Sequence, residues 1–571
     1  MLFDVLTFVK RYQYLLTATL LIICGVAIRL ALTLIGWPHT NSEEGTMGLE
    51  AMHILLHGEH PAYLYGQHYM GADEAYIGAL AFRIFGISLV ALRLGMIALY
   101  AVFLGGVFWL AHLLYSRRVA LISLAVLVCG TPFVLQIELL ADGGKAETLA
   151  FGAMMFALAT WLALSHSHEV PARSQRRLRV AAFAAWGTFA GLALYTYAVA
   201  APFVLTSGLL LWLTCRRELR GWLAVAALGG LLIGLLPALI YTATVPFGDN
   251  PVAVFLSLHH SLNARGDAGW LMPVKQVEGT LLYTLPTVTG LVNLYPPEAL
   301  PLYGPLSPTT LVALLVGGGW SLVYLSLLTL ATARPLRSMR LRWPPRGEAN
   351  DVPPHAPTSD SSPRHQETPE VARLLLALTA WLTIAAYMVS PTAANNVNSG
   401  RYMIGLLVVL PALLWPLVEW APSGKTLPRH PWRPIAGMAL AASLVLGAVG
   451  TVQAVPDALV ADQKDLRFAH ALLSHGITRF YSDYWTCDLM IFATRERLIC
   501  GVVGDYAQPG LTRYPAYYAT VQADPHAPYV LSHGSSIEAT FLAYAAASHR
   551  LYHLSYIFGR YRVYTTLESQ P

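Results

Sequence analysis

The sequence predicts an all-α polytopic membrane domain with about eleven transmembrane helices, followed by a small C-terminal α/β soluble domain. Three observations support this fold class. Hydrophobic residues make up 55% of the 571 residues and charged residues only 12%, about half the charged share of soluble proteins. Several apolar stretches reach the roughly 20 residues that cross a bilayer. The tail, 456–571, mixes helical and β-rich patterns. A soluble enzyme, a nucleic-acid binder and a disordered scaffold are therefore excluded.

Polar breaks divide the apolar stretches into expected membrane spans. Two of these spans are short and join near Tyr195 and Tyr197, so their boundaries are the least sharply defined. The expected spans are about 15–35, 88–114, 119–137, 146–164, 180–197, 199–214, 222–242, 309–332, 372–390, 402–419 and 435–452.

The distribution of basic residues predicts the orientation of these spans. With a cytoplasmic N-terminus, the inner segments hold 20 Lys and Arg residues. The outer loops then contribute Lys145, Arg265, Lys275 and Arg401. Basic residues accumulate on the cytoplasmic side of membrane proteins, and the opposite orientation would invert this asymmetry. We expect an integral, multi-pass protein of the plasma (inner) membrane.

The polar segments predict the domain organisation. We assign residues 1–455 to the transmembrane domain, with outer loops at 36–75 and 243–308 and a disordered cytoplasmic linker at 333–371. Residues 456–571 follow the eleventh span and therefore lie outside the cytoplasm. Their helical pattern at 462–475 alternates with β-rich runs (ITRFYSD, RLICGVV, PYVLS and YRVYTT), which favours a small α/β unit. Whether Cys487 and Cys500 form a disulfide there stays open.

The first outer loop carries an acidic pair at the expected start of a helix. Asn41 or Ser42 can cap this helix and Gly58 can end it. Glu43 and Glu44 then lie in the first turn, where the helix dipole favours ionised carboxylates. Simple charge complementarity explains such a pair. Because the loop holds no Lys or Arg and follows a membrane span directly, a catalytic or ligand-binding role is favoured.

A second acidic pair, Asp73 and Glu74, precedes another short helix expected at 75–85 on the membrane surface. Helix capping and a functional role explain this pair equally well. We interpret Arg83 and Arg93 as long side chains that reach lipid headgroups. Arg29 lies within the first span, where a charge suggests either function or the same snorkelling.

Several blocks of the chain resemble the GT-C polytopic glycosyltransferases. In the first loop these are NSEEG-x-x-GLEAMHIL-x-x-GE, YGQHYMGADEAYIGAL and FG-x-S-x-x-ALRL, and further matches are IELLADGGKAETLAFG, GLALYTYAVAAPF, SGRYMIGLLVVLP and YSDYWTCDLMIFATRERLI. Within this superfamily the pattern is similar to the bacterial family 39-like branch, which includes protein O-mannosyltransferases and lipid A aminoarabinose transferases. The resemblance extends over most of the chain.

The resemblance implies transfer of a sugar from a polyprenyl-phosphate-linked donor at the outer face of the membrane. In such enzymes an acidic residue of the first loop activates the acceptor, often within an Asp-Glu pair. Here Glu43 occupies the Asp position and Glu44 follows it. We expect Glu43 to be the base, with Glu44 as the alternative. Glu138 and Asp142, in the IELLADGGKAET block, are further acidic candidates beside Asp73 and Glu74.

The chemistry of inverting transfer predicts which other side chains are needed. A base takes the acceptor proton while the phosphate departs from the opposite face of the sugar. The departing phosphate needs cationic partners. Lys145 follows two glycines at a helix start that can bind an anion, and Arg401 lies beside Tyr402 at the outer mouth of the tenth span. An interfacial anchoring role is the alternative for both. Arg265 and Lys275, in the long outer loop, are weaker candidates.

No metal or other cofactor is expected. His53 and His57 lie one helical turn apart and His60 follows, but they do not complete a ligand set. The expected partners are the lipid-linked sugar donor, membrane lipid and an acceptor that is a protein, a lipid or a polysaccharide, and no nucleic acid. Two other functions remain open. One is a transporter or flippase for a lipid-linked sugar, and the other is a catalytically inactive binding relative.

Overall fold

The protein consists of two compact units. The first contains residues 1–28, 98–138 and 145–451, and the second contains residues 29–97, 139–144 and 452–571. A computed structural model describes residues 2–165, 173–254, 256–257, 272–290, 311, 313–342, 363–394, 397–419, 432–548 and 551–566. The first outer loop therefore belongs to the same compact unit as the tail.

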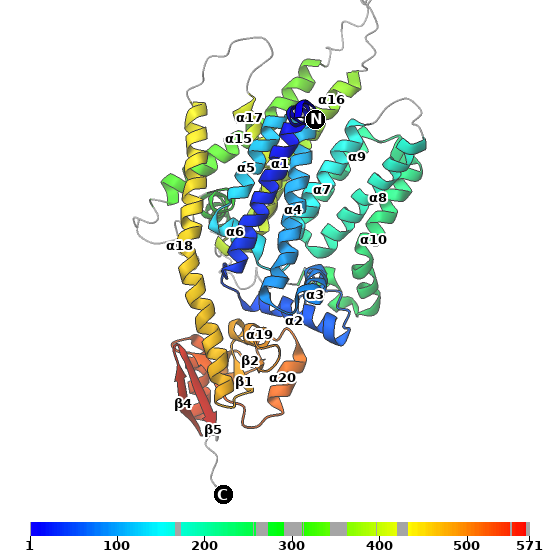
Figure 1. Ribbon diagram of the computed structural model, residues 1–571. Coiled ribbons are helices and arrows are strands. Elements are labelled where there is room, and N and C mark those ends of the chain that lie inside the picture. The colour runs from blue at the N-terminus through cyan, green and yellow to red at the C-terminus, as the bar shows by residue number, and fades with distance from the viewer. Residues whose placement is uncertain are drawn as a thin grey trace, which may run out of the picture. The chain divides into compact units, whose positions relative to one another are not determined.

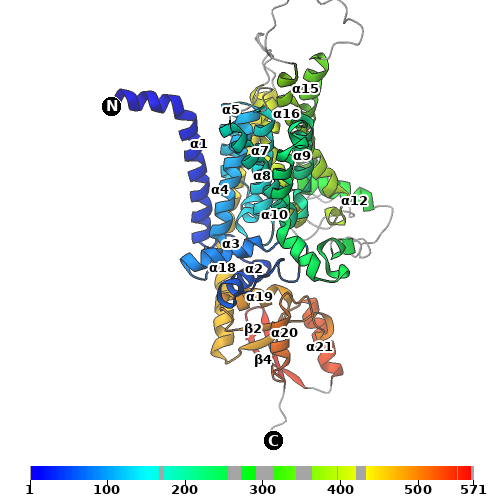
Figure 2. The same ribbon diagram turned by 90° about the vertical axis from the view of Figure 1, so that its right-hand side faces the viewer.

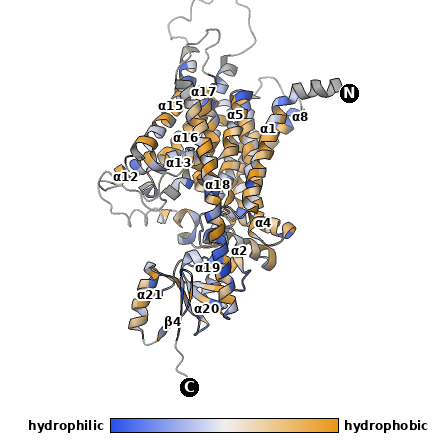
Figure 3. Cartoon of the chain, turned by 60° about the vertical axis from the view of Figure 1, so that its left-hand side comes forward, coloured by the Kyte–Doolittle hydropathy of each residue, from blue (hydrophilic) through white to orange (hydrophobic). Residues whose placement is uncertain are grey.

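The first unit is built from long apolar helices (Figures 1 and 2). In Figure 3 these helices are coloured mostly as hydrophobic residues. The helices that contribute to this unit are α1 (Leu2–Leu34), α4 (Leu89–Leu114), α5 (Arg117–Cys129), α6 (Pro132–Leu139), α7 (Lys145–Leu164), α8 (Arg173–Thr196), η1 (Ala198–Ala200), α9 (Ala201–Thr214), η2 (Glu218–Arg220), α10 (Trp222–Thr244), η3 (Phe247–Asp249), α12 (Met272–Glu278), η4 (Gly279–Thr284), α13 (Leu285–Thr289), η5 (Ala313–Gly317), α15 (Gly318–Arg342), α16 (Pro363–Met388), η6 (Pro391–Ala394), η7 (Val397–Val409), α17 (Leu410–Val418) and α18 (Trp432–Ser474).

The predicted spans are recovered as apolar helices. In the described part of the chain, nine helices are long and apolar enough to cross a membrane, and a bent pair of helices makes a tenth. The segment Ala198–Thr214 is a shorter apolar helix at the expected sixth span. The third predicted span, 119–137, is not one straight helix. It divides into α5 and α6, which meet at an angle of 84°.

Helices α8 and α10 pack closely in this unit because glycines line their contact (Figure 2). A Cβ atom added at Gly187 would lie 2.0 Å from the carbonyl oxygen of Ala227, and one added at Gly230 would lie 2.1 Å from that of Ala184. Small residues of this kind let helix backbones approach each other within a membrane.

Two expected polar segments contain more helix than predicted. The linker at 333–371 was expected to be disordered, but α15 continues to Arg342 and α16 begins at Pro363. The outer loop at 243–308 contains α12, the π-helix η4 and α13. The rest of the linker, 343–362, lies outside the described residues. Helices α15 and α16 extend past their apolar parts because Arg, Glu and Gln are good helix formers.

The second unit combines the first outer loop with the tail. The loop forms α2 (Ser42–His57) and α3 (Asp73–Phe85), which pack on each other, and α2 packs on α19 of the tail (Figure 1). The tail elements are β1 (Arg479–Ser482), α19 (Tyr484–Ala493), β2 (Ile499–Val502), η8 (Asp505–Ala507), α20 (Pro515–Gln522), β3 (Tyr529–Ser532), α21 (Ser536–Ala547), β4 (Tyr552–Phe558) and β5 (Tyr561–Thr566).

The tail contains a five-stranded mixed sheet with the order β2-β1-β3-β5-β4. Strand β1 pairs in parallel with β2 and β3, while β5 pairs antiparallel with β3 and β4. The four β-rich runs of the sequence correspond to β1, β2, β3 and β5, and β4 was not predicted. The helical pattern at 462–475 is not a separate helix, because α18 runs without a break from Trp432 to Ser474.

Candidate active site

Helix α2 begins and ends where the sequence predicts. The side chain of Asn41 accepts a hydrogen bond of 2.9 Å from the backbone N–H of Glu44, and Gly58 ends the helix with a positive φ of 68°. The cap satisfies one of the backbone N–H groups that a helix start leaves without partners. The two carboxylates of the first turn are therefore held on a well-defined helix start.

Glu44 is fully buried and paired with Arg93 of α4. The Arg93 guanidinium donates two hydrogen bonds to the two carboxylate oxygens, of 2.8 Å from Nε and 2.7 Å from Nη2. Glu44 also accepts a hydrogen bond of 3.3 Å from the backbone N–H of Ala141. Arg93 is 1% exposed, so the interpretation that it reaches lipid headgroups is wrong. A bidentate pair of this kind fixes both partners in position.

Glu43 has a different environment, since its side chain is 16% exposed. Its Oε1 atom lies 3.8 Å from Nη2 of Arg513, a buried residue of the tail. Arg513 is oriented by Tyr484, whose hydroxyl accepts hydrogen bonds of 3.1 Å and 3.0 Å from it. Residues 36–75 contain no Lys or Arg, but later parts of the chain supply an arginine to each member of the acidic pair.

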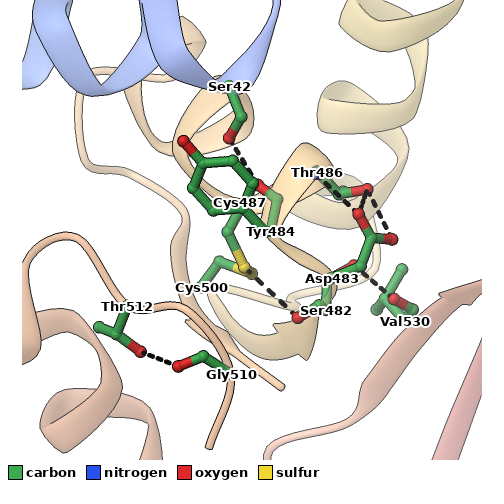
Figure 4. Close-up of a disulfide and its surroundings, with 10 residues drawn as sticks. All are labelled: Ser42, Ser482, Asp483, Tyr484, Thr486, Cys487, Cys500, Gly510, Thr512 and Val530. Carbon is green, nitrogen blue, oxygen red and sulfur yellow. Dashed lines mark hydrogen bonds between the residues drawn. A yellow bond between two sulfur atoms is a disulfide. The ribbon is translucent and has the colours of Figure 1, made fainter. Parts of the chain in front are cut away.

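Two glycines allow α2 to approach α19 closely. A Cβ atom at Gly45 would lie 2.7 Å from the backbone of Asp488, and one at Gly48 would lie 2.6 Å from the ring of Phe492. Ser42 donates a hydrogen bond of 2.6 Å to the backbone oxygen of Tyr484 (Figure 4). This close packing brings Arg513 and Asp488 to the acidic start of α2.

Asp488 is a buried carboxyl group at the contact between α2 and α19. Burial raises its pKa to about 6, although the hydroxyl of Thr46, at 2.5 Å, and the charge of Arg513 act in the opposite direction. Cys487, its neighbour in α19, forms a disulfide with Cys500 of β2 (Figure 4). The disulfide connects α19 to the sheet and answers the question that the sequence left open.

Helix α3 starts with the second acidic pair. Glu74 is buried and accepts hydrogen bonds of 2.9 Å and 2.8 Å from the backbone N–H groups of Gly143 and Gly144. Both glycines have positive φ angles, 101° and 71°, which only glycine adopts readily. The sequence predicted an anion at the helix start that follows these glycines, whereas the N–H groups of the glycines themselves bind the carboxylate of Glu74. Asp73 is partly exposed.

The predicted phosphate-binding residues Lys145, Arg401 and Tyr402 all lie in the first unit. Lys145 is buried at the start of α7, which packs against η7. Arg401 and Tyr402 belong to η7, and the guanidinium of Arg401 lies 5.4 Å from the ring centre of Tyr402. The contact between the two helices is close to these residues, because a Cβ at Gly405 would lie 3.9 Å from Thr148.

The remaining candidates lie on other elements. Lys275 is half-buried in α12, and Arg265 lies outside the described residues. Glu138, in α6, and Asp142, in the turn before α7, are both buried. Arg29 is fully buried as well. The residues that the sequence did not identify are Arg513, Tyr484 and Asp488, since no local pattern indicates that the tail contacts the first loop.

The comparisons with known proteins concern structure. No family model matches the chain, and no curated protein matches it significantly. The archaeal oligosaccharyltransferase AglB from Archaeoglobus fulgidus, in complex with an inhibitory peptide and a dolichol-phosphate, is similar with a TM-score of 0.51 and 13% identity, over 98% of this chain and 75% of that chain. The A. fulgidus oligosaccharyltransferase tethered to an acceptor peptide gives a TM-score of 0.52 and 13% identity, over 92% and 70% of the two chains.

ArnT from Cupriavidus metallidurans, bound to undecaprenyl phosphate, has a TM-score of 0.48 and 14% identity, over 96% of this chain and 98% of that chain. Because the identities are low, the likeness concerns the fold alone. Because the TM-score of ArnT is below 0.5, the comparison of folds rests on the oligosaccharyltransferase. Both enzymes are GT-C polytopic glycosyltransferases, as the motifs of the sequence indicated. The chain has the fold of the GT-C superfamily of polytopic glycosyltransferases.

Proposed function

We propose that this protein is a membrane glycosyltransferase that moves a sugar from a polyprenyl-phosphate-linked donor to an acceptor hydroxyl, with inversion. The fold supports this class of reaction, since its structural neighbours include an oligosaccharyltransferase in complex with a dolichol-phosphate. Glu43 removes the proton of the acceptor hydroxyl. The oxygen then bonds to the anomeric carbon, the bond from that carbon to the phosphate oxygen breaks, and polyprenyl phosphate leaves.

The burial of Glu44 is the observation that supports Glu43 as the base. Both oxygens of Glu44 are bound by Arg93 and the residue has no exposed surface, so an acceptor cannot reach it. Glu43 lies one residue earlier, about 100° around the helix, and its side chain is partly exposed. Arg513, whose Nη2 atom lies 3.8 Å from Oε1, orients the carboxylate, as a general base requires.

Lys145, Arg401 and Tyr402 are the proposed partners of the departing phosphate. Lys145 and Arg401 are cations on two helices that pack on each other, and Tyr402 adds a hydroxyl donor. Phosphate oxygens that gain charge in the transition state are stabilised by such groups. Loss of donor affinity in Lys145→Ala and Arg401→Ala tests this role, and unchanged affinity would remove them from the site.

We place the reaction outside the cytoplasm, with the N-terminus inside. The asymmetry of basic residues predicts this orientation. The disulfide between Cys487 and Cys500 supports it, since disulfides persist in oxidising compartments. Labelling of the tail in intact cells by a reagent that does not cross the membrane is the expected result.

The test of the reaction uses the purified protein and a panel of polyprenyl-phosphate sugars, with released polyprenyl phosphate measured by mass spectrometry. We expect Glu43→Gln to lower the rate by about 10²- to 10⁴-fold and to leave the melting temperature unchanged. Glu44→Gln should lower stability as well as rate. A full rate in Glu43→Gln would exclude Glu43 as the base. Donors that bind but stay intact would favour the flippase or the inactive binding relative.

A further inference from the structure

The C-terminal end of α2 carries a second cluster of titratable side chains, apart from the acidic pair at its start. His53 and His57 occupy consecutive turns of α2, and Glu59 follows the glycine that ends the helix. One ligand atom from each residue lies within 4.8 Å of the other two. His53 is ten residues after Glu43, which corresponds to about 15 Å along the helix axis. The cluster is therefore separate from the proposed base.

We propose that His53, His57 and Glu59 bind a divalent transition metal ion, with Zn²⁺ as the best match to two imidazoles and one carboxylate. Three protein ligands of these types, with one position left for water, are a recurrent zinc arrangement. His60, the third histidine of the stretch 53–60, takes no part in this cluster. Glu59 completes the ligand set that the sequence alone did not show.

The geometry around His53 assigns a role to each of its ring nitrogens. Nδ1 lies 4.0 Å from Oε1 of Glu59, and closing this gap by less than about 1 Å brings both atoms within reach of one ion. Nε2 faces the opposite way and lies 3.1 Å from the carboxylate of Glu496. Metal-bound histidines commonly donate their second N–H to a carboxylate, which orients the ring and strengthens it as a ligand.

Tyrosines hold both carboxylates in place. Tyr65 and Tyr514 donate hydrogen bonds of 2.5 Å and 2.9 Å to the two oxygens of Glu59. Tyr517 donates one of 2.8 Å to Glu496.

The burial of the three ligands suggests an open coordination position. His53 is 1% exposed, Glu59 is partly buried and His57 is exposed to solvent. An ion bound here therefore contacts water on the side of His57. Because Glu59 and Glu496 are both hydrogen-bonded to tail residues, the ion would strengthen the attachment of the first loop to the tail.

The test measures metal binding and is independent of transfer activity. The full chain is purified in detergent with a tag that contains no histidine, and it is freed of metal with a chelator. Zn²⁺ is titrated against a chromophoric competitor, and Co²⁺ is used as a spectroscopic probe of coordination. We expect roughly one ion per chain, a four-coordinate Co²⁺ spectrum and a melting temperature that rises with added Zn²⁺.

Exposed His57 is the most informative position, because its replacement leaves the buried network intact. His57→Ala and Glu59→Gln should lower Zn²⁺ affinity by at least about 100-fold, and Glu496→Gln by about 10- to 100-fold. His60→Ala is the matched control and should bind as the wild type does. Equal affinities in the wild type and His57→Ala would overturn the proposal, as would a loss in His60→Ala as large as that in His57→Ala.

Discussion

The two acidic helix starts of the second unit, at α2 and α3, follow the same rule with different partners. In each pair the second carboxylate is buried and hydrogen-bonded, and the first is partly exposed. Glu44 pairs with the Arg93 guanidinium, whereas Glu74 accepts hydrogen bonds from two backbone N–H groups of the glycine turn. Adjacent helix residues point about 100° apart, so one position of each pair faces inward and the other does not. In both pairs the second position carries the buried, hydrogen-bonded carboxylate and the first stays partly exposed.

Breaking the pair at α2 should have the largest effect on stability. Arg93→Ala leaves the Glu44 carboxylate buried without its counter-charge, which costs about 3–5 kcal/mol. Thermal unfolding in detergent measures the loss. Arg83→Ala is the control, since Arg83 is exposed on α3 and its loss should change stability by no more than about 0.5 kcal/mol. Similar losses in the two variants would show that the pair is not stabilising.

The corresponding change at α3 should cost less, because backbone amides carry no full charge. Glu74→Gln weakens the two hydrogen bonds to Gly143 and Gly144 and should cost about 1.5–3 kcal/mol. Asp73→Asn removes the favourable interaction of the charge with the helix dipole, about 0.3–1 kcal/mol. The two melting temperatures test this order, and an equal loss in both variants would contradict the comparison.

Asp488 lies where α19 packs on α2, and it adds a pH dependence to this helix start. Burial raises its pKa to about 6 from 3.8, so the folded state binds this proton more tightly than the unfolded state does. The contribution of Asp488 to stability therefore falls as the pH rises from about 4 to 6, by on the order of 2 kcal/mol. Asp488→Asn should gain stability relative to the wild type at pH 8 and not at pH 4. A stability difference that does not change with pH would disprove this.

Removing the cap of α2 should give the smallest change in stability. The side chain of Asn41 caps α2, whereas Ala72 at the start of α3 makes no such bond. Asn41→Ala should cost about 1 kcal/mol, and Asn41→Ser should restore most of it. Far-UV circular dichroism and thermal unfolding of the two variants provide the measurement. Failure of the serine to restore stability would point to a role of Asn41 other than capping.

Local patterns predicted much of this molecule. The apolar runs located the spans, because the length of such a run is sufficient to identify a bilayer crossing. Asn41 and Gly58 predicted the bounds of α2, because capping depends on a few neighbouring residues. The unpredicted strand β4 pairs with β5 at the edge of the sheet, and its sequence, YHLSYIF, has no clear alternation. The break between α5 and α6 follows Cys129, at Gly130, and the hydropathy of the region conceals it.

The sequence by itself determined the class of the protein, its spans and the acidic start of α2, since hydropathy, helix caps and neighbouring charges are properties of short segments. Only the tertiary structure decided which carboxylate of the acidic pair is buried in an ion pair and which stays partly exposed. Arg93 binds Glu44 and Arg513 approaches Glu43, and neither arginine is near the pair in the chain. It also joined Glu59 to two histidines and surrounded them with tail tyrosines. Such contacts depend on how distant segments pack, which no local pattern specifies.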